Sequence, residues 1–268
     1  MMKKFKILIF LVIFLVYNIF LTDNKIQENF DNNFLHTIVD KVYVINMDKD
    51  KERMYILDKK MKELGIKYQR ITGVDGKKVY PKYKDKTKLR PGQIGCLLSH
   101  LNILNDAIKN KYDNILVLED DILFHRNFHN EFKKKYNKLM KNEKNYDLIY
   151  LGCHQSLNGD GYWSRIKMKE EYYENNTTDG TFAMLINKNI FQDIINFVEN
   201  LELPIDTAIS KYILSNNKYK TYSFFPHLII SDVSLLSNTD SRQRDMQKYI
   251  KSNKIDIKNF NLQRNTNY

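Results

Sequence analysis

Near the middle of the chain, four apolar residues are followed by three acidic ones, Ile115-Leu116-Val117-Leu118-Glu119-Asp120-Asp121, and this run is the strongest indication of the fold. Four consecutive apolar residues are typical of a strand that is buried on both faces. The three carboxylates that follow cannot belong to the same core, because a buried ion is costly unless it is paired or binds a metal. In open α/β sheets the ligand crevice lies outside the carboxyl ends of the strands, so the triplet is predicted to face a ligand.

The spacing of the carboxylates suggests a metal site. Successive side chains of an extended segment point to opposite faces, so Glu119 and Asp121 are predicted to converge on one ligand while Asp120 points away. Hard oxygen ligands suit Mn²⁺ or Mg²⁺, and such a cation can hold a diphosphate. The alternative is an acidic loop start or helix cap, because carboxylates in unusual environments also serve structure.

Composition limits the class of protein. The chain has 268 residues, enough for one domain with a sizeable core, and a net charge of +11. A basic chain suggests a nucleic-acid binder, but the lysines are interleaved with acidic residues, and the densest lysine runs lack stacking aromatics. We therefore expect a solvated basic surface and no nucleic-acid partner. Cys96 and Cys153 are expected to be small core residues, and no zinc site is expected.

The amino terminus differs from the rest. Three lysines within the first six residues precede an apolar run from Ile7 to Leu21. This run is short for a membrane span, which needs about 20 residues, but no small-residue cleavage site follows it. We predict an uncleaved signal-anchor over residues 1–22 and a polar stem over 23–39, with a cleaved signal as the alternative. The lysines predict a single-pass type II membrane protein, its domain on the lumenal side of the secretory pathway if the cell is eukaryotic.

Alternating strands and helices follow the stem. We expect strands at 41–46, 67–71, 115–119, 147–151, 182–186, 219–225 and 227–230. We expect helices after the first strand, from Pro91 onward, and at 128–141, 189–200 and 205–214, the one at 128–141 being lysine-rich and exposed. This alternation predicts an α/β fold over 40–240, with a mostly parallel sheet and helices on both faces. Residues 241–268 are expected to be a polar, weakly ordered C-terminal tail.

The helix from Pro91 carries two different faces. Proline suits the first turn of a helix, where a missing N–H costs nothing. Apolar residues from Ile94 to Ile108 form a core stripe. Gly92, Gly95 and Ser99 lie on another face, where small side chains let a backbone or a ligand approach closely.

Several motifs in order resemble glycosyltransferase family 25, the group of lipopolysaccharide and procollagen galactosyltransferases. Residues 91–100 are similar to the family's P-G-E-I-G-C-x-L-S-H, with Gln93 in place of Glu, and 118–121 match its L-E-D-D. Residues 44–53 resemble V-I-N-L-D-x-x-x-x-R, and 70–76 resemble R-x-x-A-x-D-G, with Gly73 in place of Ala. The segments 180–183 and 203–206 resemble G-T-x-G/A and L-P-x-D. The resemblance covers roughly residues 40 to 235.

The resemblance implies a GT-A-type, Rossmann-like nucleotide-sugar domain. It implies a metal-dependent, inverting transfer of galactose or glucose from a UDP-sugar to a glycan or a hydroxylysine-type protein hydroxyl. The alternative is a non-catalytic nucleotide-sugar or carbohydrate-binding module, for which Gln93 and Gly73 leave room. Another nucleotidyl or phosphoryl transferase would explain the acidic strand end but not the surrounding motifs, and no G-x-x-x-x-G-K-S/T loop is present.

The resemblance also suggests roles for single residues. It makes Asp206 the candidate general base, although the residue alone would be taken as a helix cap. The predicted donor-binding residues are Asn46, Asp48, Arg53, Asp75, Ser99 and Asp120. Asp48 could instead cap a helix, and Arg53 could form a surface ion pair.

Three further residues, His100, His227 and Asp232, lie in or near these motifs or in the last strands. His100 is expected to be a hydrogen-bonded core histidine. Whether His227 or Asp232 binds a metal stays open.

Overall fold

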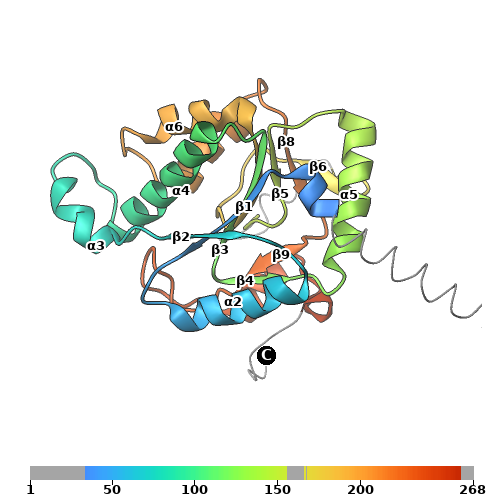
Figure 1. Ribbon diagram of the computed structural model, residues 1–268, viewed down its shortest axis with the longest axis horizontal. Coiled ribbons are helices and arrows are strands. Elements are labelled where there is room, and N and C mark those ends of the chain that lie inside the picture. The colour runs from blue at the N-terminus through green and yellow to red at the C-terminus, as the bar shows by residue number, and fades with distance from the viewer. Residues whose placement is uncertain (1–33, 156–165, 167, 261–268) are drawn as a thin grey trace, which may run out of the picture.

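A seven-stranded sheet lies at the centre of the computed structural model, which describes residues 34–155, 166 and 168–260 (Figure 1). The strand order is β2-β1-β3-β7-β5-β8-β6. The strands are β1 (Lys41–Asn46), β2 (Gln69–Thr72), β3 (Asn114–Glu119), β5 (Leu148–Tyr150), β6 (Tyr172–Glu174), β7 (Ala183–Asn187) and β8 (Thr221–Phe224). A separate two-stranded sheet pairs β4 (Ile122–Phe124) with β9 (Ile229–Ser231).

Most strands of the large sheet run in one direction. β1 is parallel to both β2 and β3, and β5 is parallel to β8. β7 runs antiparallel between β3 and β5, and β6 runs antiparallel to β8. Five of the seven strands therefore point the same way, with β7 and β6 reversed. This confirms the predicted α/β fold with a mostly parallel sheet.

Helices cover both faces of the sheet. The longer ones are α2 (Lys51–Glu63), α4 (Pro91–Lys109), α5 (Phe128–Glu143) and α6 (Phe191–Val198). The shorter ones are α3 (Gly76–Val79), α7 (Ile205–Ile209) and α8 (Met246–Ser252), with 3-10 turns at Tyr80–Lys82, Lys188–Ile190 and Ile257–Asn259 and a π-helical turn at Ser210–Leu214. Figure 1 shows α4 and α6 on one side of the sheet and α2 on the other.

Period-two alternation along β3 divides the core between these two faces. Leu116 and Leu118 pack with residues of α2 and α5, whereas Ile115 and Val117 pack with residues of α4 and α6. All four side chains are buried. The apolar run thus joins both halves of the core, as the sequence predicts.

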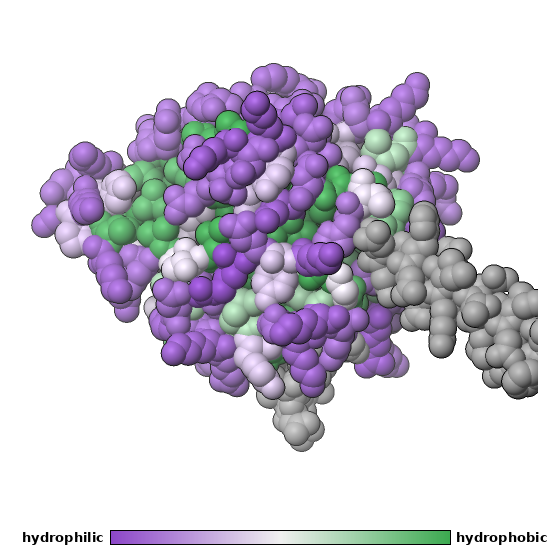
Figure 2. All heavy atoms as spheres, in the orientation of Figure 1, coloured by the Kyte–Doolittle hydropathy of each residue, from purple (hydrophilic) through white to green (hydrophobic). Residues whose placement is uncertain are grey.

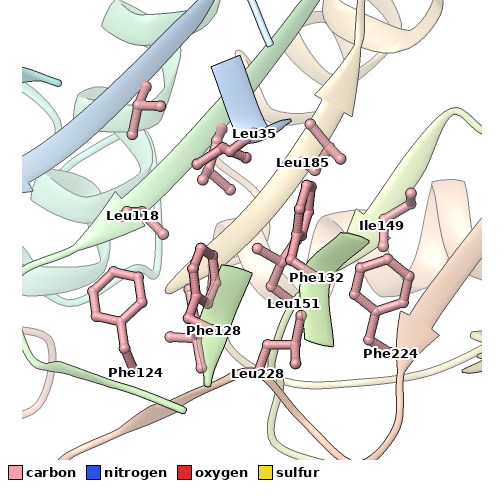
Figure 3. Close-up of a cluster of buried hydrophobic side chains, with 14 of the residues drawn as sticks. Leu35, Leu118, Phe124, Phe128, Phe132, Ile149, Leu151, Leu185, Phe224 and Leu228 are labelled. Carbon is pink, nitrogen blue, oxygen red and sulfur yellow. The ribbon is translucent and has the colours of Figure 1, made fainter. Parts of the chain in front are cut away.

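Helix α5 is not the exposed helix that its lysines suggest. Phe128, Phe132 and Leu139 are fully buried, and Figure 3 shows Phe128 and Phe132 beside Leu118 and Leu151. Lys135 is buried too, and its Nζ lies 2.7 Å from Glu171 Oε2. The prediction of exposure is wrong because an apolar stripe at helical spacing runs between the lysines.

Both ends of the described chain pack on the domain. Leu35 and Val39 are buried against the α5 face, so the stem prediction is wrong for 34–39. Met246, Tyr249 and Phe260 pack with residues next to β9, so the prediction of a weakly ordered tail is wrong up to residue 260. In each case a few apolar side chains within a polar segment find partners far away in sequence.

The predicted signal-anchor, the stem up to residue 33 and the last eight residues lie outside the described residues. The type II topology therefore stays a prediction. Within the part of the chain that the structure describes, no helix combines the length and the apolar character that a membrane span requires. Figure 2 shows the described surface as mostly hydrophilic on this face, with apolar residues visible between the polar ones.

Candidate functional site

Two adjoining cavities lie outside the carboxyl ends of β1 and β3. The α4 cavity, of about 370 Å³, is enclosed by the end of β1, segment 73–77, the first turns of α4 and segment 238–241. The α7 cavity, of about 160 Å³, is enclosed by segment 179–182, the start of α7 and residues between 231 and 244. Both cavities are lined by Cys96, Glu119 and Thr239, so they meet at these side chains.

The acidic triplet lies where the chain leaves one sheet for the other. Glu119 ends β3 of the large sheet, and Ile122 begins β4 of the small sheet. Glu119 and Asp121 both line the α7 cavity. Asp120 instead accepts a hydrogen bond from Asn46 Nδ2 at 2.6 Å and pairs with Arg53 at 3.2 Å. Glu119 and Asp121 thus share the α7 cavity, but Asp120 does not point away from the site altogether, since it lines the α4 cavity together with Glu119.

Asp121 carries a carboxylate oxygen without a partner. Its Oδ1 is buried and has no hydrogen-bond partner among the described residues, while Ser231 Oγ donates to Oδ2 at 3.3 Å. Burial, together with the charges of Glu119 and Asp120, raises the pKa of Asp121 to about 8. An unpaired oxygen beside two more carboxylates is an arrangement that a bound cation would stabilise.

Glu119 is held in its ionised form. Burial acts to raise its pKa, but His100, with its Nε2 3.6 Å from Glu119 Oε1, and the Thr181 hydroxyl, which donates at 2.8 Å, hold the pKa below its usual value. An ionised Glu119 beside Asp121 is a donor set of hard oxygens. The residues present therefore fit a Mn²⁺ or Mg²⁺ ion.

Three of the predicted donor-binding residues lie behind the cavities. Asn46 bridges two charges, donating to Asp120 while its Oδ1 accepts from Arg70 Nε at 2.9 Å. Arg53 pairs with Asp120, and Asp48 pairs with Arg70 and is largely exposed. None of Asn46, Asp48 and Arg53 lines the α4 or the α7 cavity. Asn46 and Arg53 compensate the buried carboxylate of Asp120. Through these contacts they hold the acidic triplet in place.

The other three predicted donor-binding residues, Asp75, Ser99 and Asp120, line the α4 cavity. Asp75 caps α3 by accepting from Lys77 N at 3.0 Å. Ser99 Oγ accepts from Val74 N at 2.8 Å and donates to Gly95 O at 2.7 Å. Ser99 therefore fixes segment 73–77 against α4, which shapes the cavity wall.

Gly95 lies at the contact between α4 and segment 73–77, and a substitution there tests how close this contact is. A Cβ at this position would clash with the carbonyl oxygen of Val74 and lie 2.9 Å from the nitrogen of Gly76. Gly95→Ala should therefore lower the free energy of unfolding by about 1–3 kcal/mol, as overpacking does, measured by urea denaturation. Asn102→Ala on the exposed face of α4 is the control, expected to stay within about ±0.5 kcal/mol. Equal stability of both variants would contradict the close contact.

Asp206 lies in the first turn of α7 and lines the α7 cavity. It is not the capping residue, since Pro204 occupies the N-cap, and its Oδ1 accepts only from the adjacent Thr207 among the described residues, at 2.8 Å from the nitrogen. Asp179 lines the same cavity, and burial together with the charge of Asp206 raises the pKa of Asp179. Two more carboxylates thus line the α7 cavity besides Glu119 and Asp121.

Sequence reasoning missed several residues of the cavity walls. Cys96 and His100 approach Glu119, and their spacing of four residues on one helix was a signal that could have been read. His154, Asp179 and Arg244 line the α7 cavity without any local signal. Burial and the nearby Arg244 charge lower the pKa of His154 to about 4, so its ring is neutral.

The two late candidates for metal binding lie elsewhere. Neither His227 nor Asp232 lines the α4 or the α7 cavity. His227 is buried beside Phe224 O, at 3.0 Å from its Nδ1. Asp232 accepts hydrogen bonds from the backbone and the hydroxyl of Ser234.

Comparison with known proteins gives consistent matches. The family model described as glycosyltransferase family 25 (LPS biosynthesis protein) matches residues 39–209. Procollagen galactosyltransferase 2 of Homo sapiens is 32% identical over 132 residues, which are 42% of this chain and 20% of that protein. A glycosyltransferase 25 family member of Anopheles gambiae is 34% identical over 139 residues, 46% of this chain and 23% of that protein. The chain thus spans about a fifth of the length of these relatives.

Solved structures resemble the chain more weakly. UDP-glucose pyrophosphorylase complexed with UDP-glucose has a TM-score of 0.40 at 10% identity, covering 86% of this chain and 83% of the other. Mannose-1-phosphate geranyltransferase from Thermus thermophilus has a TM-score of 0.37 at 10% identity, covering 75% and 79%. At these scores the likeness carries no argument about function.

Proposed function

The chain belongs to glycosyltransferase family 25, and from this premise we propose that it transfers galactose or glucose from a UDP-sugar to a hydroxyl group of a glycan or a protein. The observation that carries the proposal is the position of Glu119 and Asp121. The Glu119 side chain lies where the α4 and α7 cavities meet, and Asp121 lines the α7 cavity beside it, just past the carboxyl end of β3. A donor with its nucleotide in one cavity and its sugar in the other would place its diphosphate beside them.

The α4 cavity suits the nucleoside part of the donor. Gly92 and Gly95 let segments 238–239 and 74–76 approach α4 closely and so form the cavity wall, and Asp75 and Asp120 line the cavity with carboxylates that can accept from hydroxyl groups. Its volume of about 370 Å³ falls within the usual range of about 300–1,000 Å³ for small-molecule sites. The smaller α7 cavity is left for the sugar and the attacking hydroxyl.

Glu119 and Asp121 would hold a divalent cation, which supplies positive charge to the departing diphosphate. Asn46 and Arg53 keep Asp120, and with it the whole triplet, in position. Asp206, on the α7 side, would accept the proton of the acceptor hydroxyl as it attacks. Inversion at the sugar carbon follows from a single direct attack, and it is proposed on the family relationship.

The acceptor is proposed only as a class. The human relative is named for a protein substrate, procollagen, while the family description names lipopolysaccharide (LPS) biosynthesis. We propose a hydroxyl acceptor of either kind, a glycan or a hydroxylysine-type side chain. The α7 cavity, with Asp179, His154 and Arg244 in its wall, offers polar groups that could orient such a hydroxyl.

The test is incubation of the full-length chain with common UDP-sugars and Mn²⁺. We expect release of UDP that stops when the metal is chelated, and donor binding that depends on the metal. NMR of the product would give the anomeric configuration. No UDP release and no metal-dependent binding with any UDP-sugar would contradict the proposal. Donor binding without turnover, even with added acceptors, would point instead to a binding module.

A further inference from the structure

Three different ligand types meet at the junction of the two cavities. The Sγ of Cys96, a ring nitrogen of His100 and a carboxylate oxygen of Glu119 all lie within 4.8 Å of one another. All three residues line the α4 cavity, and Cys96 and Glu119 line the α7 cavity as well. The cluster therefore faces the space assigned to the donor.

The fold brings these atoms together by simple geometry. Cys96 and His100 are four residues apart in α4 and share one face of the helix. Glu119 reaches them from the end of β3, whose apolar residues pack on α4. Secondary structure on both sides holds the cluster, which makes it more rigid than a site built from loops.

His100 provides independent evidence for a ligand. Its side chain is only 2% exposed, and its Nε2 has no hydrogen-bond partner within the described residues. The Nε2 lies 3.6 Å from Glu119 Oε1, beyond hydrogen-bond distance. Tetrahedral zinc, with bonds of about 2.0–2.3 Å, places neighbouring ligand atoms roughly 3.3–3.8 Å apart. The observed separation of 3.6 Å lies within this range, so the two groups are placed as two ligands of one ion would be.

We propose that Cys96, His100 and Glu119 bind a thiophilic divalent cation of the Zn²⁺ class, and that this cation inhibits the enzyme by occupying Glu119. The binding site stands on the geometry of the cluster alone. The inhibition rests on the proposed transferase function, in which Glu119 holds the cation of the donor.

The ligand set selects the metal. Thiolate and imidazole favour Zn²⁺ and Co²⁺, whereas Mg²⁺ prefers oxygen ligands only. Binding forms a Cys96 sulfur–metal bond and releases the thiol proton to solvent, with no change of oxidation state. Three protein ligands leave a fourth position open toward the cavities, where a water molecule completes the tetrahedron.

Competition follows from the shared carboxylate. A Glu119 carboxylate that is bound to a cation at Cys96 and His100 is no longer available to a second cation beside Asp121. Zn²⁺ should therefore oppose activation by Mn²⁺, and excess Mn²⁺ should restore turnover. Inhibition of this kind raises the Mn²⁺ concentration that gives half-maximal activity.

Co²⁺ absorption spectroscopy on the full-length protein, in a non-thiol reductant, tests the site directly. Wild type should give a near-ultraviolet thiolate-to-cobalt charge-transfer band, which added Zn²⁺ abolishes. Cys96→Ser should remove the band and weaken Co²⁺ binding at least ~10-fold, because even an orienting group behind a ligand contributes about 10–100-fold. The matched control is Cys153→Ser: Cys153 is buried among Gln155, Tyr173 and Ser223 and does not line either cavity.

The outcomes separate the two halves of the proposal. His100→Asn provides a second ligand variant if Cys96→Ser does not fold, with thermal melting as the check. A wild-type protein without the band, or a band retained in both ligand variants, overturns the site. Zn²⁺ inhibition that is equal in wild type and His100→Asn overturns the regulatory role. A protein that shows the band but no transfer of any sugar keeps the site and contradicts the proposed function.

Discussion

Asp121→Ala should lower metal-dependent turnover by at least ~10²-fold, the usual cost of removing one electrostatic stabiliser of the departing charge. The Asp121 carboxylate faces the α7 cavity, and its Oδ1 has no hydrogen-bond partner within the described part of the chain. The variant should therefore fold and lose its response to Mn²⁺. Initial rates across a Mn²⁺ series, with circular dichroism of the same sample, measure both effects. A variant that unfolds, or one with wild-type activity, would mean that the carboxylate is structural.

Asp121 should also make stability depend on pH. Its pKa is raised from 3.8 in the unfolded chain to about 8 in the folded one. Between these values the folded chain keeps a proton that the unfolded chain has lost, so this group lowers the free energy of unfolding as pH rises from about 4 to about 8. Asp121→Asn removes the ionisation, so it should be more stable than wild type above pH 8 and equal to it near pH 4.

The same carboxyl makes metal binding depend on pH. A cation binds the ionised form, so binding of Mn²⁺ releases the proton of Asp121, and the affinity for Mn²⁺ should fall as pH drops below about 8. Thermal melting of wild type and Asp121→Asn, with and without Mn²⁺, checks both effects. A gain in stability together with a loss of turnover is the pattern expected where a site holds charges that the fold alone would avoid.

The central part of the fold could be predicted from local patterns. The apolar run of β3 and the proline-led, glycine-containing α4 both have strong signals, and the structure confirms them at residues 114–119 and 91–109. Helix and strand periods differ, so the alternation of elements also predicts a mostly parallel sheet. Strand β6, at Tyr172–Glu174, was not predicted because it is a three-residue strand at the edge of the sheet, next to β8.

The packing of two polar segments was not predicted from the sequence. The lysines of α5 masked Phe128 and Phe132, and residues 241–260 masked Met246 and Tyr249. In both segments polar residues are interspersed with a few apolar side chains that pack on distant elements. Average polarity is a poor guide there, because the partners lie far away along the chain.

In the candidate site, too, local patterns predicted some features, while others depend on how distant segments pack. Strand alternation predicts that Glu119 and Asp121 share one cavity, as they do, but Asp120 also lines the α4 cavity with Glu119. The alternation of side chains could not show that Asn46 and Arg53 bind Asp120, because these contacts depend on where β1 and α2 lie against β3. Nor could it bring Asp179 to Asp206, which only the folded chain places in one cavity wall.

Asp206→Asn should lower kcat for transfer to a hydroxyl by ~10²- to 10⁴-fold, the usual contribution of a general base. The KM for the donor should change little, because Asp206 lies on the α7 side and not among the residues of the α4 cavity. Asparagine keeps the shape of the side chain and removes its ability to accept a proton. Steady-state kinetics with an alcohol acceptor measures the loss, and azide, an anionic nucleophile that needs no base, should react at a rate close to that of wild type.

Asp179→Asn is the matched control, since Asp179 is a second carboxylate in the wall of the same cavity. Its pKa is raised by burial and by the charge of Asp206, so Asp206→Asn should lower the pKa of Asp179 toward its usual value. If Asp179→Asn loses the larger factor and is rescued by azide, Asp179 is the base and Asp206 only tunes it. If both variants lose hydroxyl transfer and azide transfer alike, the two carboxylates orient the acceptor, and neither takes its proton.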